Sequence, residues 1–228
     1  MAFNYSPKII TDGLVLCLDA ANTKSYPGSG TVWSDLSRGG NNGTLTNGPT
    51  FNSANGGSIV FDSTNDMATI PYNNDFNLCS ITNWTISIWI KLTDIIGSFN
   101  CLIGQWPQDG GDAWLLAHTN GTVGFVWAPF SRNNYMFQSN TPLVVGNWTN
   151  VVLVKNGSNF TLYQNTTSVG TFTNASTKSS SYRVELGRYG RSSSYIGAQY
   201  STIAINHRAL SATEVLQNYN ATKSRFGL

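Results

Sequence analysis

The chain has 228 residues, a formal net charge of +2 and 11% charged residues, against 40% hydrophobic and 12% aromatic residues. This composition is typical of a folded chain with a sizeable core and excludes a disordered one. Lys and Arg form no run, so the charge offers nothing to a nucleic-acid partner, and no apolar run is long enough for membrane insertion.

The N-terminal residues show no secretory signal, because no basic stretch is followed by an apolar run. The three cysteines, Cys17, Cys79 and Cys101, have unrelated spacings. That pattern is typical of reduced thiols in a protein made in a cytoplasm. We expect residues 1–12 to form an N-terminal arm or an edge strand, and residues 13–228 to form one domain.

The first predicted strand, residues 13–20, is followed by a Gly- and Asn-rich run over residues 35–51. There Asn42-Gly43 predicts a tight turn and a short strand follows it, and the next turn leads into a second strand. Leu45 and Phe51 are the expected core anchors of this run. It lacks the lysine of a phosphate-binding loop.

Residues 83–92, NWTISIWIKL, alternate with a period of two, which is typical of a strand with one buried face. Trp84 and Ile86 lie on one face, and Trp89 lies on the other. Short segments of similar character, separated by turns, predict an all-β protein: a two-sheet antiparallel jelly-roll sandwich. These segments are residues 57–63, 67–72, 100–106, 113–119, 121–127, 134–140, 150–156, 159–165, 168–174, 182–189 and 200–206.

One segment near the C-terminus has helical character. Ser211 and Glu214 have the spacing of a capping box, which predicts a helix over about residues 211–223. Leu210, Val215 and Tyr219 would dock this helix on the rim of the sandwich.

Catalytic constellations are missing from the sequence. Glycoside hydrolysis usually needs two carboxyl groups across the scissile bond. Of the two glutamates, Glu214 caps the helix and Glu185 stands alone in its strand, while the nine aspartates lie mostly at turns. The two histidines, His118 and His207, have no spacing relationship to a nucleophile, and clustered zinc ligands are absent. We therefore predict that the protein is not an enzyme.

Two short acidic loops offer oxygen ligands of the kind that calcium prefers. They contain Asp62 and Asp66, and Asp109 and Asp112. The alternative is that these residues make turns by bonding their own backbone. No cofactor is required, and a structural calcium ion is the one metal hypothesis.

Aromatic residues supply a binding hypothesis, because exposed rings stack on sugars and anchor protein interfaces. Core packing is the alternative for each of them. The candidates are Trp89, Trp106, Trp114, Trp127 and Tyr135.

Several consecutive segments resemble the laminin-G-like branch of the concanavalin A-like jelly rolls. They are GLVLCLDAANTKSYPGSGTVWSDLS, NNGTLTNGPTF, IVFDSTNDMATIP, NWTISIWIKL, GNWTNVVLVKNGSNFTLYQN and INHRALSATEVLQNYNATKSRFGL. The resemblance covers residues 13–228. It implies two curved antiparallel sheets, with glycans or proteins bound at the concave face or rim loops, and a structural calcium in many members. Here Asn65 and Met67 replace an acidic and an aromatic residue of the family pattern, which weakens the calcium hypothesis.

The YPGSG loop, the segment NGTLTNGPTF and the C-terminal LSATEVLQNYNATKSRFG resemble modules of tailed-bacteriophage virion proteins. The resemblance implies a non-enzymatic virion surface protein, of the capsid decoration or fibre-tip type, made in the host cytoplasm. Its expected partners are other virion proteins of the capsid or tail, with adhesion to glycans as a further role. The arm residues Tyr5, Pro7, Ile9 and Ile10 would tether it.

Two alternatives to the virion role stay open at this point. The chain is a lectin-like module whose main role is to recognise a host receptor, or, more remotely, a glycoside hydrolase. A homo-oligomer built through an exposed strand edge or sheet face is compatible with either role. A fold of this kind hosts lectins, hydrolases and scaffolds alike, so fold alone does not choose among them.

Overall fold

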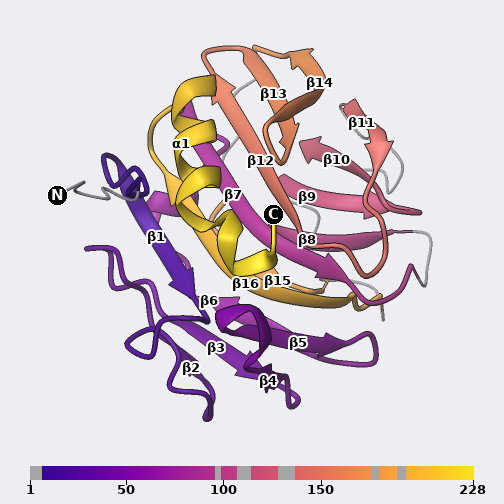
Figure 1. Cartoon of the computed structure of the whole chain (residues 1–228). Coiled ribbons are helices and arrows are strands. Elements are labelled where there is room, and N and C mark those ends of the chain that lie inside the picture. Colours follow the sequence, from indigo (N-terminus) through magenta and orange to yellow (C-terminus); the bar gives the residue numbers. More distant parts are fainter. Residues whose placement is uncertain (1–6, 96–98, 107–113, 128–136, 176–179, 189–193) are drawn as a thin grey trace, which may run out of the picture.

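The computed structural model describes residues 7–95, 99–106, 114–127, 137–175, 180–188 and 194–228. Two antiparallel sheets of eight strands each pack face to face (Figure 1). This is the two-sheet sandwich that the alternating strands predict.

Sheet A has the order β14-β13-β12-β7-β16-β5-β4, and β1 pairs with β16 beside β5. Its centre is formed by the two longest strands, β7 and β16. The strands are β1 (Leu14–Asp19), β4 (Thr50–Asn52), β5 (Ser58–Asp62), β7 (Asn83–Leu92), β12 (Thr149–Asn156), β13 (Asn159–Gln164), β14 (Thr167–Thr173) and β16 (Gly197–Asn206).

Sheet B has the order β11-β10-β9-β8-β15-β6-β3-β2. Its strands are β2 (Val32–Trp33), β3 (Gly43–Thr46), β6 (Met67–Ile70), β8 (Asn100–Gln105), β9 (Trp114–Thr119), β10 (Thr122–Trp127), β11 (Phe137–Pro142) and β15 (Val184–Leu186). The sequence pattern did not predict β2, because two residues are too short to show a period.

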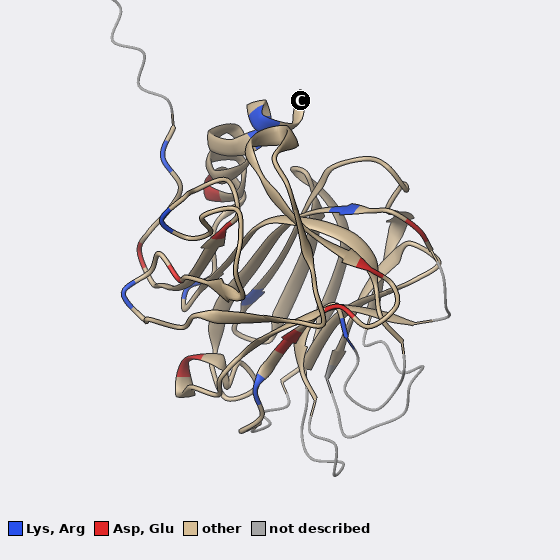
Figure 2. Cartoon of the chain, turned by 90° about the horizontal axis from the view of Figure 1, so that it is seen from below, with Lys and Arg blue, Asp and Glu red and all other residues tan. Residues whose placement is uncertain are grey.

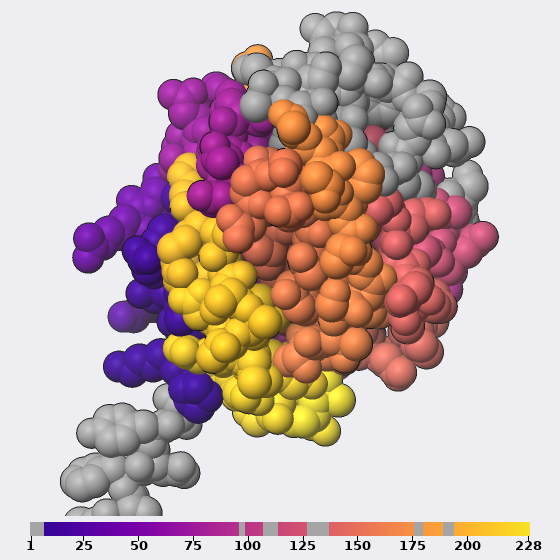
Figure 3. All heavy atoms as spheres, turned by 90° about the horizontal axis from the view of Figure 1, so that it is seen from above, coloured from indigo at the N-terminus to yellow at the C-terminus, as the bar shows by residue number. Residues whose placement is uncertain are grey.

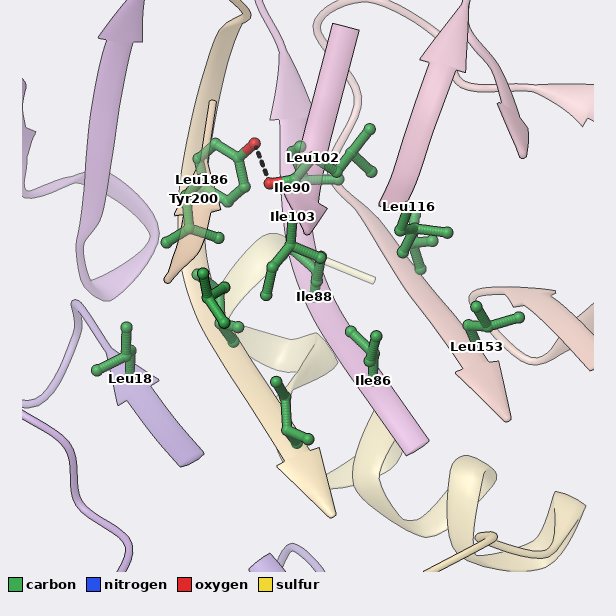
Figure 4. Close-up of a cluster of buried hydrophobic side chains, with 14 of the residues drawn as sticks. Leu18, Ile86, Ile88, Ile90, Leu102, Ile103, Leu116, Leu153, Leu186 and Tyr200 are labelled. Atoms are coloured by element: carbon green, nitrogen blue, oxygen red, sulfur yellow. Dashed lines mark hydrogen bonds between the residues drawn. The ribbon is translucent and has the colours of Figure 1, made fainter. Parts of the chain in front are cut away.

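The inner faces of the two sheets form the main core. Ile86, Ile88 and Ile90 of β7 are buried, as the period-two pattern predicts. Tyr200 of β16 crosses between the sheets, and its hydroxyl donates a 3.0 Å hydrogen bond to the carbonyl oxygen of Leu102 in β8 (Figure 4). A buried tyrosine hydroxyl needs such a partner, because burying an unpaired polar group is costly.

His118 of β9 is also buried between the sheets. The backbone N–H of Gly121 donates to its Nδ1 at 3.3 Å, and its Nε2 has no hydrogen-bond partner among the described residues. Burial lowers the pKa of His118 to about 4, although the charge of Asp94 acts in the opposite direction. The ring is therefore neutral at pH 7.

The predicted C-terminal helix is α1 (Ala212–Thr222), and it continues as the 3₁₀ helix η3 (Lys223–Phe226). Two shorter 3₁₀ helices, η1 (Ala54–Gly56) and η2 (Asn74–Phe76), lie in loops. The predicted capping box is confirmed, because Ser211 accepts from the N–H of Glu214 and the Glu214 carboxylate accepts from the N–H of Ser211.

The prediction that this helix docks on the rim is wrong in one respect. Leu210 and Val215 pack against Val152 and Val154 of β12, which lie on the outer face of sheet A. The helix therefore covers a sheet face, and in Figure 3 it lies between the N-terminal segment and the segment around β12 and β13. The reason is that β12 presents apolar side chains on both of its faces.

Residues 7–13 are not part of any strand, so the edge-strand interpretation of the arm is wrong for this part of it. The arm runs along α1 instead. The backbone N–H of Ile10 donates to Asn218 Oδ1 at 2.7 Å, and Gln217 Nε2 donates to the carbonyl oxygen of Lys8 at 2.7 Å. Hydrogen bonds to helix side chains thus replace a β ladder.

Asp35 organises the Gly- and Asn-rich run. Its carboxylate accepts from the backbone N–H groups of Cys17, Ser37 and Asn41 at 2.8–2.9 Å. Leu45 is buried in the core as predicted, and the half-buried Phe51 packs against it. The run is therefore a turn framework between strands.

The positions of Lys and Arg and those of Asp and Glu are spread over the described part of the fold (Figure 2). None of the described helices is long and apolar enough to cross a membrane.

Candidate functional site

A single register row crosses the outer face of sheet B and defines the candidate site. In this row Glu185 of β15 pairs with Thr69 of β6 on one side and with Gly104 of β8 on the other. Thr69 in turn pairs with Thr44, and Thr44 with Val32. These residues share the face opposite the core, because side chains alternate along each strand.

The two halves of this row differ in character. Beyond Gly104 the row continues through Leu115 and Val126, which are buried in a small cluster with Cys101 and Trp106. On the other side of Glu185, Thr69 is half-buried, and Thr44 and Val32 are exposed. Only this polar half, over β15, β6 and β3, offers an open surface among the described residues.

Glu185 lies at the boundary between the two halves and is 1% exposed. Arg183, two residues earlier on the same face, contacts its Oε1 with Nε at 2.8 Å and Nη2 at 2.6 Å. The Arg183 side chain is 39% exposed. The buried carboxylate therefore holds a guanidinium group at the surface.

The second carboxylate oxygen, Oε2 of Glu185, is buried and has no hydrogen-bond partner among the residues that the structure describes. A buried carboxylate oxygen without a hydrogen bond lowers the stability of the fold, so a functional role would account for its presence. The nearby Cys101 thiol stays protonated, because burial raises its pKa and the charge of Glu185 raises it further.

Two arginine–tyrosine pairs flank Glu185. Arg183 lies over the ring of Tyr182 at 5.4 Å, and Arg188 lies over the ring of Tyr195 at 5.8 Å. Arg188 also approaches Met67 Sδ at 3.9 Å, on the same outer face. Guanidinium groups held against aromatic rings present planar donors in a fixed direction.

This arrangement can bind but lacks a second carboxylate. Across the eight strands of sheet B, Glu185 is the only Asp or Glu residue. Acid–base cleavage of a glycosidic bond usually needs two carboxyl groups on either side of the bond. The described part of this face therefore supplies recognition groups without the usual catalytic pair.

A laminin G family model, described as the concanavalin A-like lectin/glucanases superfamily, matches residues 62–216. The chain belongs to this superfamily. The match confirms the predicted family resemblance and the two-sheet fold. No curated protein matches the sequence.

Several solved structures are similar to this chain in fold, at low sequence identity. The binding domain of Paraclostridial Mosquitocidal Protein 1 has a TM-score of 0.69 and 16% identity, over 92% of this chain and 52% of that one. Trypanosoma rangeli sialidase in complex with the inhibitor DANA has a TM-score of 0.68 and 15% identity, over 92% and 33%.

A third structure is domain 4 of AbnA, a GH43 extracellular arabinanase from Geobacillus stearothermophilus, in complex with arabinotriose. It has a TM-score of 0.71 and 15% identity, over 92% of this chain and 100% of that one. The chain thus spans about half of the mosquitocidal chain and a third of the sialidase. These likenesses show the fold alone.

Among the aromatic residues predicted to bind, three are buried. Trp89 is on the outer face of sheet A, as predicted, but Tyr219 and Phe226 stack on it. Trp114 is in the main core, where its Nε1 donates to Gln105 Oε1 at 2.8 Å.

Trp106 belongs to the cluster on sheet B. Its ring is buried, like those of Trp89 and Trp114, and has no exposed face on which a ligand could stack. The prediction that these three rings are exposed for binding is therefore wrong. The Trp127 side chain and Tyr135 lie outside the described residues.

Asp62 and Asp66 lie in the loop between β5 and β6. Asp62 Oδ1 accepts from the backbone N–H of Thr64 at 2.8 Å, and this bond lowers its pKa. Burial, followed by the charge of Asp62, raises the pKa of Asp66. The described residues include no group of three His, Cys, Asp or Glu side chains that could hold a metal.

The loop geometry fits the alternative in which aspartate makes its own turn. Asp109 and Asp112 lie outside the described residues, so calcium binding stays a prediction for this chain.

Of the predicted tether residues, Tyr5 lies outside the described residues. Pro7 and Ile9 are exposed, while Ile10 packs against the cluster that contains Val215. The tether stays a prediction. Ile10 packs against the helix of its own chain.

Sequence reasoning missed Arg183, Arg188, Tyr182 and Tyr195. The segment YRVELGRY did carry a signal, because Arg183 and Glu185 are two residues apart in a strand and so share one face. The bridge between Arg188 and Tyr195 depends on a chain reversal that periodicity does not reveal.

Proposed function

We propose that this protein is a non-catalytic glycan-binding module on the surface of a bacteriophage virion. The observation that carries the binding role is the single carboxylate in the strands of sheet B, which holds Arg183 at the surface. Arg183 lies over the ring of Tyr182, and Arg188 lies over the ring of Tyr195. Arginine N–H groups donate to sugar hydroxyls, and tyrosine rings pack on sugar C–H faces.

Membership of a lectin/glucanase superfamily supports the glycan as the ligand class. The absence of a second carboxylate from the strands of sheet B supports binding without turnover. In this role Arg183 is the residue that a ligand meets first, and Glu185 is a positioning residue.

A glycan array tests the binding role. The wild type is expected to bind at least one glycan, and Arg183→Ala to weaken that binding about tenfold or more, as loss of one charge-assisted hydrogen bond implies. Arg38→Ala is the matched control, because Arg38 is an exposed arginine in a loop outside sheet B. Absence of any glycan signal, or equal losses for both variants, would contradict the proposal.

Incubation of the bound glycan with excess protein tests the non-catalytic part. The glycan should be recovered intact. Release of shorter products by the wild type would show hydrolysis and remove this part of the proposal.

The virion role is supported by the resemblance of residues 26–30, 42–51 and 210–227 to phage structural modules. Mass spectrometry of purified particles is the direct test, and the protein should appear at a copy number that matches the symmetry of the capsid or of the tail. If purified particles lack the protein while infected cells contain it, the protein is not part of the virion and the virion role is wrong.

A further inference from the structure

A cavity of about 210 Å³ lies on the opposite side of the molecule from the site on sheet B, between the outer face of sheet A and the C-terminal segment. This is many times the space that one buried water molecule needs. The cavity is independent of the glycan site, since none of its residues belongs to sheet B.

The floor of the cavity is made by neighbouring register rows of sheet A. One row reads Asp19, Thr202, Trp89 and Asn150 across β1, β16, β7 and β12. The next row contributes Cys17, Ala204 and Ser87. Apart from Trp89, these side chains are small or polar, so they leave space between the sheet and the C-terminal segment. Farther along β12, the side chains of the strand pack directly against α1.

The roof comes from Asn218, Ala221, Thr222 and Arg225 of the C-terminal segment, and one wall from Ile9 and Ile10 of the arm. The fold holds the roof firmly. Trp89 Nε1 donates to Thr222 Oγ1 at 2.9 Å, and Asn218 Oδ1 binds the arm at Ile10. The cavity is therefore a formed feature of the fold.

One polar group on the floor lacks a partner. Asn150 is 2% exposed, and its Nδ2 donates to Ser87 Oγ and to the carbonyl oxygen of Ile88 at 3.3 Å. Its Oδ1 is buried and accepts no hydrogen bond from the described residues. Because a water-sized molecule does not reach this oxygen, the polar groups that the cavity offers to a ligand are the Ser87 and Thr202 hydroxyls and the Arg225 guanidinium group.

The charges of the cavity lining cancel. Arg225 Nη1 contacts both carboxylate oxygens of Asp19, at 2.9 and 3.0 Å, and no other lining residue is ionised at pH 7. Burial raises the pKa of Cys17 to about 12, so that thiol is neutral and unreactive. An ionic ligand would find no unpaired opposite charge here.

We infer that this cavity binds a compact, uncharged polyhydroxylated molecule, the size of a polyol or one sugar ring. Hydroxyl groups both donate and accept, which matches the Ser87 and Thr202 hydroxyls and the Arg225 N–H groups of the lining. The C–H surface of such a molecule would lie against Ile9, Ile10 and Ala221.

The indole N–H signal of Trp89 in a nitrogen-15 NMR spectrum reports on this cavity, because its acceptor Thr222 is part of the lining. Trp89→Phe identifies the signal. Glycerol, L-arabinose and D-glucose are the probes, with D-glucuronate as the charged comparison. At least one neutral probe should shift the signal saturably, and glucuronate should do so at least tenfold more weakly.

Ala221→Leu should abolish this shift, because the larger side chain fills the cavity. Asn220→Leu is the matched control, since Asn220 is the neighbouring exposed position of α1 and does not line the cavity.

No saturable shift with any neutral probe, or a shift that persists in Ala221→Leu, would overturn the inference. The outcome is separable from that of the glycan array. Arg183→Ala should leave this shift unchanged, and Ala221→Leu should leave array binding unchanged.

Discussion

Trp89 and Thr222 join the central strand β7 to the C-terminal helix. The indole Nε1 of Trp89 donates to Thr222 Oγ1 at 2.9 Å, while the rings of Phe226 and Tyr219 stack on the indole at 4.1 and 5.5 Å. A residue 133 positions away in sequence thus satisfies the polar atom of a buried tryptophan on this face.

Trp89→Ala should lower the free energy of unfolding by about 3–5 kcal/mol, because it removes a buried aromatic ring and leaves a cavity. Thr222→Val keeps the volume and removes the hydroxyl, which accepts from Trp89 and donates to the carbonyl oxygen of Asn218 at 2.9 Å, so we expect a loss of about 1 kcal/mol. Urea unfolding followed by circular dichroism measures both. Equal losses would show that the hydrogen bond, and not the packing, dominates.

His118 predicts a pH dependence of stability. Burial lowers its folded-state pKa to about 4, while an unfolded histidine titrates near 6.5. Between these values the unfolded state binds more protons, so stability falls as the pH is lowered from 6.5 to 4, and this loss is complete below 4. The total contribution is about 3 kcal/mol.

His118→Gln should flatten this limb, because glutamine does not titrate and still offers an acceptor to Gly121. Urea unfolding at half-unit steps of pH compares the two proteins. An unchanged slope between pH 6.5 and 4 in the variant would assign the effect to other groups.

The capping box predicts a second, more acidic limb. Hydrogen bonds from Arg208 and from the Ser211 backbone lower the pKa of Glu214 to about 2. The stability that Glu214 contributes is present above its ordinary pKa of 4.5 and is lost as the pH falls toward 2. Glu214→Gln should remove this limb and leave the limb of His118 in place.

Ser211→Ala tests the same cap at neutral pH. Loss of an N-cap hydroxyl typically costs about 1 kcal/mol. Thr213→Ala is the control, since Thr213 is an exposed position in the first turn of α1 and makes no cap bond. A larger loss in the control variant would contradict the assignment of Ser211 as the cap.

Gly104 separates Glu185 from Leu115 in the register row of sheet B. A Cβ atom at this position would lie within 3 Å of the Leu115 side chain and of the carbonyl oxygen of Trp114. Gly104→Ala should therefore destabilise the protein by about 1–3 kcal/mol through overpacking.

Thr69→Ala lies in the same row on an open part of the surface and should change stability by less than about 0.5 kcal/mol. Thermal unfolding of both variants measures the difference. If Gly104→Ala is as stable as Thr69→Ala, the tight approach of β8 and β9 at this point is wrong.

The strands were predictable because the period-two pattern of each strand identifies its buried face. In β7 the alternation of Ile86, Ile88 and Ile90 with polar residues identifies the core face directly. The cap at Ser211 is equally local. By contrast, β2 is too short for a period, and the docking of α1 on a face rather than a rim required knowing that Val152 and Val154 point outward.

The site residues were less predictable than the fold. Trp89 and Trp114 are both tryptophans in strand segments, yet Trp89 is covered by the C-terminal helix and Trp114 lies in the core. Exposure therefore does not follow from residue type. Arg188 and Tyr195 are brought together by a reversal of the chain. The seven residues of the cavity floor come from four strands that span residues 17–204.

The sequence by itself determined the β-rich class, most strand positions, the capped helix and the family, because these depend on local periodicity and on residues close together in the chain. Only the tertiary structure decided which aromatic rings are covered, that Arg183 stands at the surface over Glu185, and that a polar cavity remains beneath the C-terminal segment. Those features depend on strand register and on which sheet face the helix covers, and both are set by contacts between residues far apart in sequence.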